Sequence, residues 1–221
     1  MLTQASLPSN VIKARHAGAD TGVGAIEMIG TMMSFARNAE IYGEGEEVEF
    51  LYKVISGTVR TYKVLADGRR QIGAFYLAGD LFGLEAGDDH SFSAEAVSDS
   101  KVLVIKRSAI FALAARNSDV ARQLWNLTTR ELRRMQSHIM LLIKSAHERV
   151  AGFLLEMADR SAASSEFDLP MSRQDIADYL GLTIETVSRT LTSLENAAAI
   201  SIPSARRIVL RDRAALSALS G

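Results

Sequence analysis

Between residues 172 and 196, apolar positions recur with the period of an α-helix in two short runs. Ser172 followed by Asp175 fits a capping box at the start of the first run, and Gly181 offers the backbone freedom that a helix C-cap needs. Thr183 can then cap a second helix that ends near Asn196. The apolar positions of each helix share one face: Ile176, Ala177 and Leu180 in the first, Val187, Leu191 and Leu194 in the second. The pattern predicts two packed helices joined by a tight turn.

Polar residues of the second helix form a separate stripe: Glu185, Ser188, Arg189 and Thr192. An arginine can bond O6 and N7 of guanine together, a glutamate can accept from the amino group of cytosine, and a serine hydroxyl adapts to either base. Such a stripe is also what an ordinary solvated helix face looks like, so its surroundings have to decide. In a helix-turn-helix, the second helix reads base edges in the major groove.

Two short β-forming runs, 199–202 and 207–210, follow the second helix. Turn residues 203–205 separate them, so we expect a small hairpin beside the helices, the wing of a winged helix-turn-helix. From residue 203 onward the local charge is +3, four arginines minus one acid. The charged residues are Arg206, Arg207, Arg211, Asp212 and Arg213. This excess suits contact with DNA phosphates.

The first half of the chain has a different pattern, because glycines punctuate short β-rich runs from about residue 40 to residue 106. The glycines are Gly43, Gly57, Gly68 and Gly79. Asp67-Gly68 stands between two alternating segments and predicts a hairpin. Residues 94–108 supply two further strands. Short strands at such regular spacing predict a β-sandwich or barrel.

A single long helix is predicted from Asn117 to about Ser145, since no proline or glycine interrupts a helical period there. One heptad-like seam runs through Trp125, Thr128, Leu132, Met135, Ile139 and Leu142. A second register runs through Glu131, Met135, His138 and Leu142. One register should face a second copy of the chain and the other the barrel, and the sequence leaves both open. We assign both sets of side chains, His138 included, to a candidate dimerisation helix.

The composition excludes several classes of protein and of binding site. The chain has 221 residues, 48% of them hydrophobic, a net charge of −1 and no cysteine. The absence of cysteine excludes disulfides and cysteine-ligated zinc or iron–sulfur centres. No apolar run reaches the roughly 18–20 residues that a membrane span requires. The N-terminal residues 1–27 lack the hydrophobic core of a signal peptide, and we expect them to be poorly ordered. We expect a bacterial cytoplasmic protein with no membrane partner.

A glycine-punctuated β-roll, a long helix and a winged helix-turn-helix together resemble the Crp/Fnr family of bacterial transcription regulators over about residues 28–213. Segments 67–85 and 172–195 are similar to the FixK branch of that family. The resemblance implies an α+β fold with a cyclic-nucleotide-binding-like double-stranded β-helix, or jelly roll, at its N-terminal side. It implies these units: an extension, 1–27; the β-roll, 28–115; the dimerisation helix, 116–145; and the winged helix-turn-helix, 146–221.

The resemblance also implies a function and its residues. In the Fnr and FixK branches a Glu, two arbitrary residues, Ser and Arg read the bases, and Glu185, Ser188 and Arg189 match them here. The implied site is a palindrome like TTGAT-N4-ATCAA, bound by a homodimer. Further contacts to the DNA backbone, or support for them, are expected from Ser172, Arg173, Thr183, Thr186, Thr192, Arg206 and Arg207. The other implied partner is RNA polymerase, and the implied targets are genes of low-oxygen or nitrogen-fixation-linked metabolism.

A cofactor is not expected. Relatives that bind cyclic nucleotides carry a Glu and an Arg where this chain has Leu84 and Phe92, and a buried phosphate without its arginine is costly. The four histidines are scattered, so neither haem nor another metal is expected, and His90 is interpreted as a surface residue.

Two alternatives stay open. The roll could bind an unidentified small molecule, which a polar pocket would favour and a filling by Phe75, Phe82 and Phe92 would oppose. A cupin-like metalloenzyme is the other alternative, but it needs several histidines in the roll, where the sequence offers His90 alone. No Ser-His-Asp or phosphate-loop signature is present, so we expect a regulator and not an enzyme.

Overall fold

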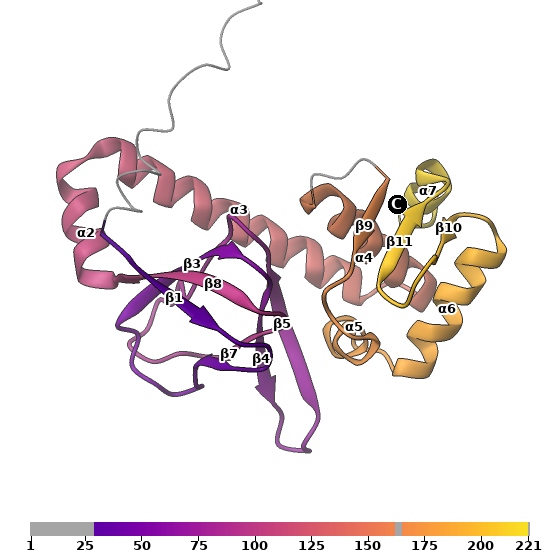
Figure 1. Ribbon diagram of the computed structural model, residues 1–221, viewed down its shortest axis with the longest axis horizontal. Helices are drawn as coiled ribbons and strands as arrows, with labels where there is room; N and C mark the ends of the chain where they lie inside the picture. Colours follow the sequence, from indigo (N-terminus) through magenta and orange to yellow (C-terminus); the bar gives the residue numbers. More distant parts are fainter. Residues whose placement is uncertain (1–28, 162–164, 221) are drawn as a thin grey trace, which may run out of the picture.

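The structure is a computed structural model that describes residues 29–161 and 165–220 (Figure 1). Its N-terminal part is a β-roll of two antiparallel sheets. In the described residues, one sheet has the strand order β1-β8-β3-β6 and the other β2-β7-β4-β5. The strands are β1 (Thr31–Phe35), β2 (Glu40–Tyr42), β3 (Phe50–Ser56), β4 (Val59–Val64), β5 (Arg70–Tyr76), β6 (Leu81–Phe82), β7 (Ser93–Ala96) and β8 (Ser100–Lys106). The expected extension, residues 1–27, lies outside the described residues.

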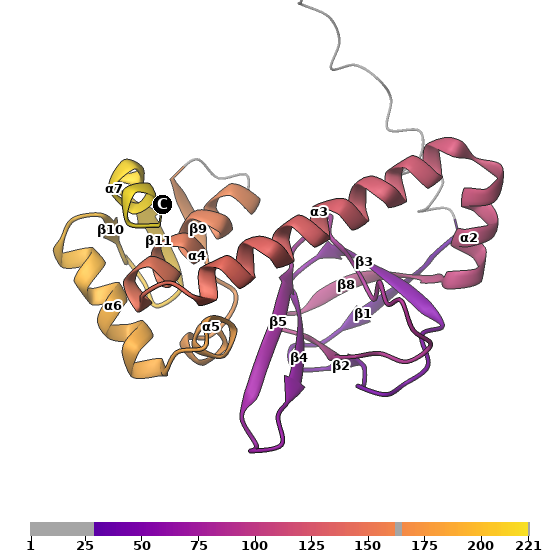
Figure 2. The same cartoon turned by 180° about the vertical axis from the view of Figure 1, so that it is seen from behind.

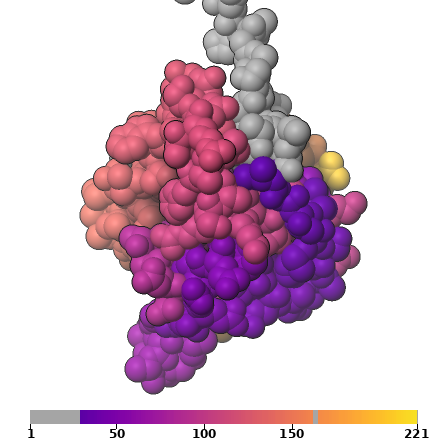
Figure 3. Space-filling view, turned by 90° about the vertical axis from the view of Figure 1, so that its left-hand side faces the viewer, coloured from indigo at the N-terminus to yellow at the C-terminus, as the bar shows by residue number. Residues whose placement is uncertain are grey.

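Two of the glycines that were expected to separate the strands, Gly57 and Gly68, lie in turns of the roll. Gly57 joins β3 to β4 with a φ of +85°, and a Cβ there would lie 2.4 Å from the carbonyl oxygen of Asp99. The predicted Asp67-Gly68 hairpin is confirmed, because Val64 of β4 pairs with Arg70 of β5. Figure 3 shows the roll end of the molecule, where this hairpin projects below the body of the roll.

Aromatic rings fill the centre of the roll. The ring of His90 stacks on that of Tyr42 with 3.6 Å between centroids, and Tyr52 stacks on Phe82 at 5.1 Å. The interpretation of His90 as a surface residue is wrong: it is 2% exposed, and burial lowers its pKa. Of the three phenylalanines whose filling of the roll would oppose a ligand there, Phe82 lies in the core of the roll and Phe92 is half-buried. Phe75 does not fill the roll, because its ring packs toward the C-terminal domain.

Two helices follow the roll, α2 (Arg107–Arg116) and α3 (Ser118–Leu142). The long helix predicted from residue 117 is confirmed and is slightly shorter, since Asn117 is its N-cap and α3 ends at Leu142. Figure 2 shows α3 running from the roll to the C-terminal domain. No helix in residues 29–161 or 165–220 has the length and apolar character needed to cross a bilayer.

The structure separates the two registers of α3. Trp125, Leu132, Met135 and Ile139 of the first register are exposed large hydrophobic residues. Side chains that belong only to the second register face the same chain: the hydroxyl of Tyr76 donates to Glu131 over 3.3 Å, and His138 stacks on Tyr179 with 4.0 Å between centroids. His138 therefore does not belong to the exposed seam, which corrects its assignment to the dimer face. Leu142 is half-buried at the end of the helix.

His138 makes stability depend on pH. Burial and the neighbouring charge of Arg134 lower its pKa from 6.5 to about 4. The unfolded chain therefore binds more protons between these values, and stability falls as pH drops from about 6.5 toward 4. We expect the thermal unfolding midpoint of the wild type to fall more steeply from pH 7 to pH 5 than that of His138→Gln.

His147→Gln is the matched control for that comparison, because His147 is exposed and lies on a different helix. Its midpoint should follow the wild-type curve. Parallel curves for the wild type and His138→Gln would contradict the contribution of His138.

The C-terminal domain comprises α4 (Ala146–Arg160), β9 (Glu166–Asp168), α5 (Arg173–Leu180), α6 (Ile184–Asn196), β10 (Ile200–Ser201), β11 (Arg207–Leu210) and α7 (Arg213–Ser220). The predicted wing is confirmed as β10 and β11, with Ile200 opposite Leu210. β9 pairs with the other edge of β11, a strand that the sequence pattern did not predict. The α+β fold with roll, long helix and helix-turn-helix is as expected.

Candidate nucleic-acid interface

The helix α5 begins and ends where the sequence predicts. The hydroxyl of Ser172 accepts from the backbone N–H of Asp175 over 3.0 Å, and the carboxylate of Asp175 accepts from the backbone N–H of Ser172 over 3.0 Å. Both bonds of a capping box are thus present. At the other end Gly181 adopts the left-handed conformation with a φ of 61°. The backbone then turns directly into α6.

The helix α6 has one face fixed in the core and one free. Thr183 caps it by accepting from the N–H of Thr186 over 3.2 Å. Val187, Leu191 and Leu194 are buried, as the apolar period predicts. In Figure 1, α6 lies at the far end of the C-terminal domain from the roll. A helix anchored on one side and open on the other can enter a groove of about 12 Å, the width of the major groove of B-DNA.

The predicted base-reading residues, Glu185, Ser188 and Arg189, are all exposed on the free face, as is Thr192. Thr186 is half-buried, and its hydroxyl lies 3.5 Å from Nη2 of Arg189. The pKa of Glu185 is below its ordinary value because its own backbone N–H and Thr183 donate to the carboxylate. An ionised Glu185 is a hydrogen-bond acceptor only, which suits a base amino group.

Some of the side chains that are expected to contact the DNA backbone are already hydrogen-bonded or paired within the protein, and others are free. Ser172 and Thr183 use their hydroxyls as helix caps. Arg207 is paired with Glu166 of β9, which reduces the free charge that the wing was expected to carry. Arg206 is exposed and makes no ion pair within residues 29–161 and 165–220. Arg173 is half-buried, burial lowers its pKa, and it reaches the carbonyl of Ala205 at 3.5 Å.

An ion cluster that the sequence did not reveal joins the helix-turn-helix to the roll. Asp175 of α5 accepts from Arg60 of β4 over 2.9 Å and from Arg70 of β5 over 2.6 Å. Glu95 of β7 pairs with Arg60, and Asp178 of α5 pairs with Arg70. Both carboxylates of α5 are thus tied to strands of the other domain.

Asp175 is the buried centre of this cluster, with 4% of its surface exposed. Burial alone would raise its pKa, but hydrogen bonds from Ser172 and the charges of Arg60 and Arg70 outweigh that effect and hold the pKa below its usual value. The carboxylate therefore stays ionised between two guanidinium groups. The same side chain both caps α5 and fixes α5 to the roll.

Apolar packing continues the contact between the two domains. The ring of Phe75 from β5 lies 5.2 Å from that of Tyr179 on α5 and 6.4 Å from that of Phe153 on α4. Ile72 of β5 is buried in the same cluster. The helix before the turn is therefore held on the roll by both charges and apolar side chains. This contact fixes α5, and the chain turns directly from α5 into α6.

Comparison with known proteins gives two matching families. Residues 32–117 match the family described as cyclic nucleotide-binding domain, and residues 148–219 match the family described as Crp-like helix-turn-helix domain. The two matches fall on the roll with α2 and on the helices and strands from α4 to α7.

Individual relatives match nearly the whole chain. The nitrogen fixation regulation protein FixK of Azorhizobium caulinodans is 52% identical over 200 residues, which cover 88% of this chain and 81% of that protein. FixK of Rhizobium meliloti is 41% identical over 181 residues, covering 81% and 82%. The solved structure of FixK2 from Bradyrhizobium japonicum gives a TM-score of 0.83 at 50% identity, and the match covers 87% of this chain and 98% of that one.

Proposed function

Because the chain belongs to the Crp/Fnr family and is a FixK-like transcription regulator with a helix-turn-helix DNA-binding domain, we propose that it binds palindromes like TTGAT-N4-ATCAA. The observation that carries this proposal is the free face of α6. That face presents Glu185, Ser188 and Arg189 together, on a helix that is capped and packed on its other side. Arg189 contacts the guanine of each half-site and Glu185 its neighbourhood, while Ser188 contacts an adjacent A or T.

We further propose a homodimer that pairs along α3. Crp/Fnr regulators act as dimers, and a palindrome requires a protein with matching two-fold symmetry. In this chain the apolar seam of Trp125, Leu132, Met135 and Ile139 is exposed along most of the helix. A long exposed apolar stripe of heptad spacing is the arrangement that a second helix covers. Thr128 lies on the same seam and is exposed as well.

The proposed regulator works without cyclic AMP. Leu84 and Phe92 stand where cyclic-nucleotide binders use a glutamate and an arginine, so the roll lacks a partner for a cyclic phosphate. Tyr42, Tyr52 and Phe82 fill the centre of the roll, and the ring of Phe82 stacks on both tyrosine rings. We propose that α6 is already oriented for DNA in the ligand-free protein, since Asp175 and its arginines fix α5.

The proposed targets follow from the relatives, two of which are named nitrogen fixation regulation proteins. We propose that the protein acts in the cytoplasm, mainly as an activator of low-oxygen or nitrogen-fixation-linked genes. Activation of this kind requires contact with RNA polymerase while the dimer is on DNA.

The proposal is tested by fluorescence anisotropy with purified protein, no added ligand and a labelled TTGAT-N4-ATCAA duplex at near-physiological salt. We expect a dissociation constant of about 10⁻⁸ M or lower, as is usual for specific sites. A scrambled duplex should bind at least about 10³-fold more weakly, since non-specific contacts use phosphates alone. A duplex with TGTGA half-sites should fall between them.

Equal affinity for all three duplexes would contradict base reading by α6. Weak binding to all three would contradict the ligand-free orientation of α6 but not the reading residues themselves. Light scattering on the same sample gives the oligomeric state. A monomer would explain weak binding by the missing dimer, whereas a dimer that binds weakly would mean that α6 is not oriented for DNA in the ligand-free protein.

A further inference from the structure

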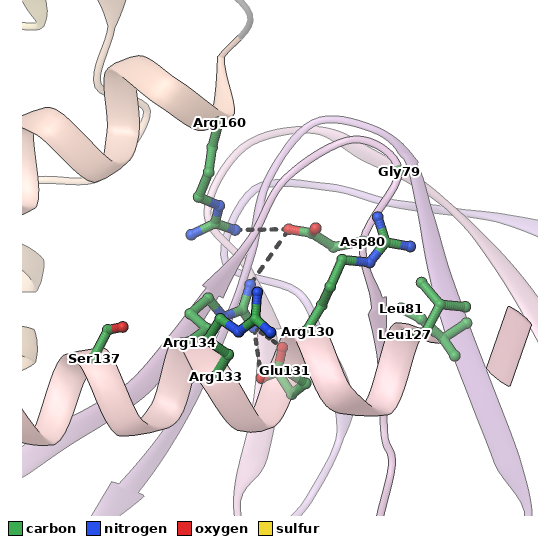
Figure 4. Close-up of a pocket in the computed structure, with 10 residues that line it drawn as sticks. All are labelled: Gly79, Asp80, Leu81, Leu127, Arg130, Glu131, Arg133, Arg134, Ser137 and Arg160. Carbon is green, nitrogen blue, oxygen red and sulfur yellow. Dashed lines mark hydrogen bonds and ion pairs between the residues drawn. The ribbon is translucent and has the colours of Figure 1, made fainter. Parts of the chain in front are cut away.

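A basic pocket lies where the roll, α3 and α4 meet (Figure 4). Its volume is about 370 Å³. The β5–β6 loop supplies Gly79 and Asp80; α3 supplies Arg130, Glu131, Arg133 and Arg134; and α4 supplies Arg160. It lies outside the centre of the roll, which aromatic rings fill. Leu84 and Phe92, which stand at the positions where cyclic-nucleotide relatives carry their ligand-binding Glu and Arg, are not among its lining residues.

The lining of the pocket carries an excess of positive charge. Four arginines face two acids, Asp80 and Glu131, which leaves a charge of +2 (four minus two) in a chain whose net charge is −1. Asp80 is held by Arg160 over 2.7 Å and by Arg134 over 3.6 Å. Arg134 also pairs with Glu131.

Arg130 and Arg133 supply the excess. Both are exposed, and neither makes an ion pair with another described residue of the chain. Figure 4 shows Asp80 between Arg160 and Arg134, while Arg130 extends toward Gly79 at the rim. Two guanidinium groups on successive turns, with their donors open to solvent, can bond a bound anion without first losing a carboxylate partner.

Dimerisation leaves this pocket open. An α-helix turns about 100° per residue, so Arg130 and Arg134 lie on the side of α3 opposite Leu132 and Ile139, while Arg133 lies about 100° from Leu132, between the two faces. The exposed apolar seam and the pocket thus occupy different faces of one helix. A second copy that covers the seam leaves Arg130 and Arg134 uncovered, with Arg133 at the edge of the covered face.

We propose that this pocket binds a small phosphorylated anion, held by Arg130 and Arg133. Arg160 at the far wall is already paired with Asp80 and Glu156 and is not a ligand of the anion. The volume suits a compact ligand and not a macromolecule. Guanidinium groups recognise phosphate through paired N–H···O bonds. Asp80 and Glu131 repel an anion, so the ligand should place its negative charge beside Arg130 and Arg133 and away from these two acids.

Such a ligand would lie between both domains, because the roll and α4 both line the pocket. The two are already in contact there, since Arg160 donates to the carbonyl of Phe75 in β5 over 2.6 Å. A ligand that bridges α3 and α4 at this point adds to the contact that orients the helix-turn-helix. The binding itself does not depend on the proposed operator sequence.

The test uses full-length protein in a buffer free of phosphate and sulfate, with pyrophosphate and inorganic phosphate as probes. We expect saturable heat release in calorimetry and a rise in the thermal unfolding midpoint with pyrophosphate. Arg130→Gln with Arg133→Gln should weaken binding at least about tenfold, since the variant removes the charge-assisted hydrogen bonds of both guanidinium groups.

The matched control is Arg37→Gln with Arg116→Gln, two exposed arginines outside the pocket whose loss changes the net charge equally. It should bind pyrophosphate like the wild type. Equal weakening in both double variants, or a response that sodium chloride reproduces at matched ionic strength, would overturn the proposal, because it would mean screening of surface charge only. Operator affinity is measured separately, so pyrophosphate can bind saturably even if the predicted operator is wrong.

Discussion

Replacing Asp175 by alanine should lower the free energy of unfolding by about 3–5 kcal/mol, the usual cost of removing one partner from a buried ion pair. The carboxylate accepts from Arg60 and Arg70, and Arg60 is only 7% exposed. Without Asp175 two guanidinium groups of the roll keep their desolvation, but each loses one of its two carboxylate partners. Urea denaturation followed by circular dichroism measures the loss.

The comparison with Asp178→Ala and Asp175→Asn isolates the cause. Of the two roll arginines, Asp178 pairs only with Arg70. Asp178→Ala should therefore lower the free energy of unfolding clearly less than Asp175→Ala. Asp175→Asn keeps an oxygen for the N–H of Ser172 but removes the charge between Arg60 and Arg70. A wild-type stability in Asp175→Asn would mean that helix capping, and not the ion cluster, explains the effect of alanine.

The same variants link stability to DNA binding. Asp175 lies on α5, and the direction of α6 follows from how α5 sits on the roll. If the cluster sets that direction, Asp175→Asn should bind the operator more weakly even at temperatures where it is fully folded. In that case fixed charges between the domains, and not a bound effector, would orient α6 in the proposed regulator.

Local signals explain why the helix-turn-helix could be predicted from the sequence. The caps Ser172, Gly181 and Thr183 act within one helical turn, so their chemistry is visible in a short window. The Asp67-Gly68 hairpin is equally local. By contrast β9, with the residues Glu166–Asp168, has no pattern of its own and is a strand because β11 pairs with it.

Long-range contacts explain what the sequence could not reveal. Arg60 and Arg70 lie 115 and 105 positions from Asp175, so no spacing links them. The available signal was a charged residue, Arg60, at a position of β4 whose neighbours are buried. His90 was misplaced for the same reason, because only the fold brings Tyr42 over its ring.

The register of α3 was undecided because both faces of the helix contain apolar residues. Contacts from outside the helix decide it: Tyr76 of the roll bonds Glu131, and Tyr179 of α5 stacks on His138. These partners fix one face against the same chain and leave Leu132 and Ile139 exposed. Heptad spacing alone predicts a seam, but the neighbours of the helix choose which seam is free.

Replacing Arg189 by alanine should weaken binding to TTGAT-N4-ATCAA more than any other change on the face of α6. Loss of a bidentate arginine–guanine contact costs about 1–3 kcal/mol per half-site, so a dimer on a palindrome loses about 2–6 kcal/mol. At 1.4 kcal/mol per factor of ten this is a loss of roughly thirtyfold or more. Arg189 is exposed and supports no core contact, so the fold should be unchanged. Anisotropy titrations measure the affinity, with thermal unfolding as the check on folding.

The dependence of affinity on DNA sequence distinguishes a contact to a base from a contact to a phosphate. Arg189→Ala should lose most of its preference for the G·C pair of the half-site, so the parent duplex and one altered at that pair should bind alike. Arg206→Ala is the matched control, since Arg206 is also exposed but lies on the wing. Its loss should weaken binding to all duplexes equally and reduce the slope of log affinity against log salt by about 1 per protomer. If Arg189→Ala instead behaved like Arg206→Ala, Arg189 would contact phosphate, and the reading of the half-site would have to rest on Glu185 and Ser188.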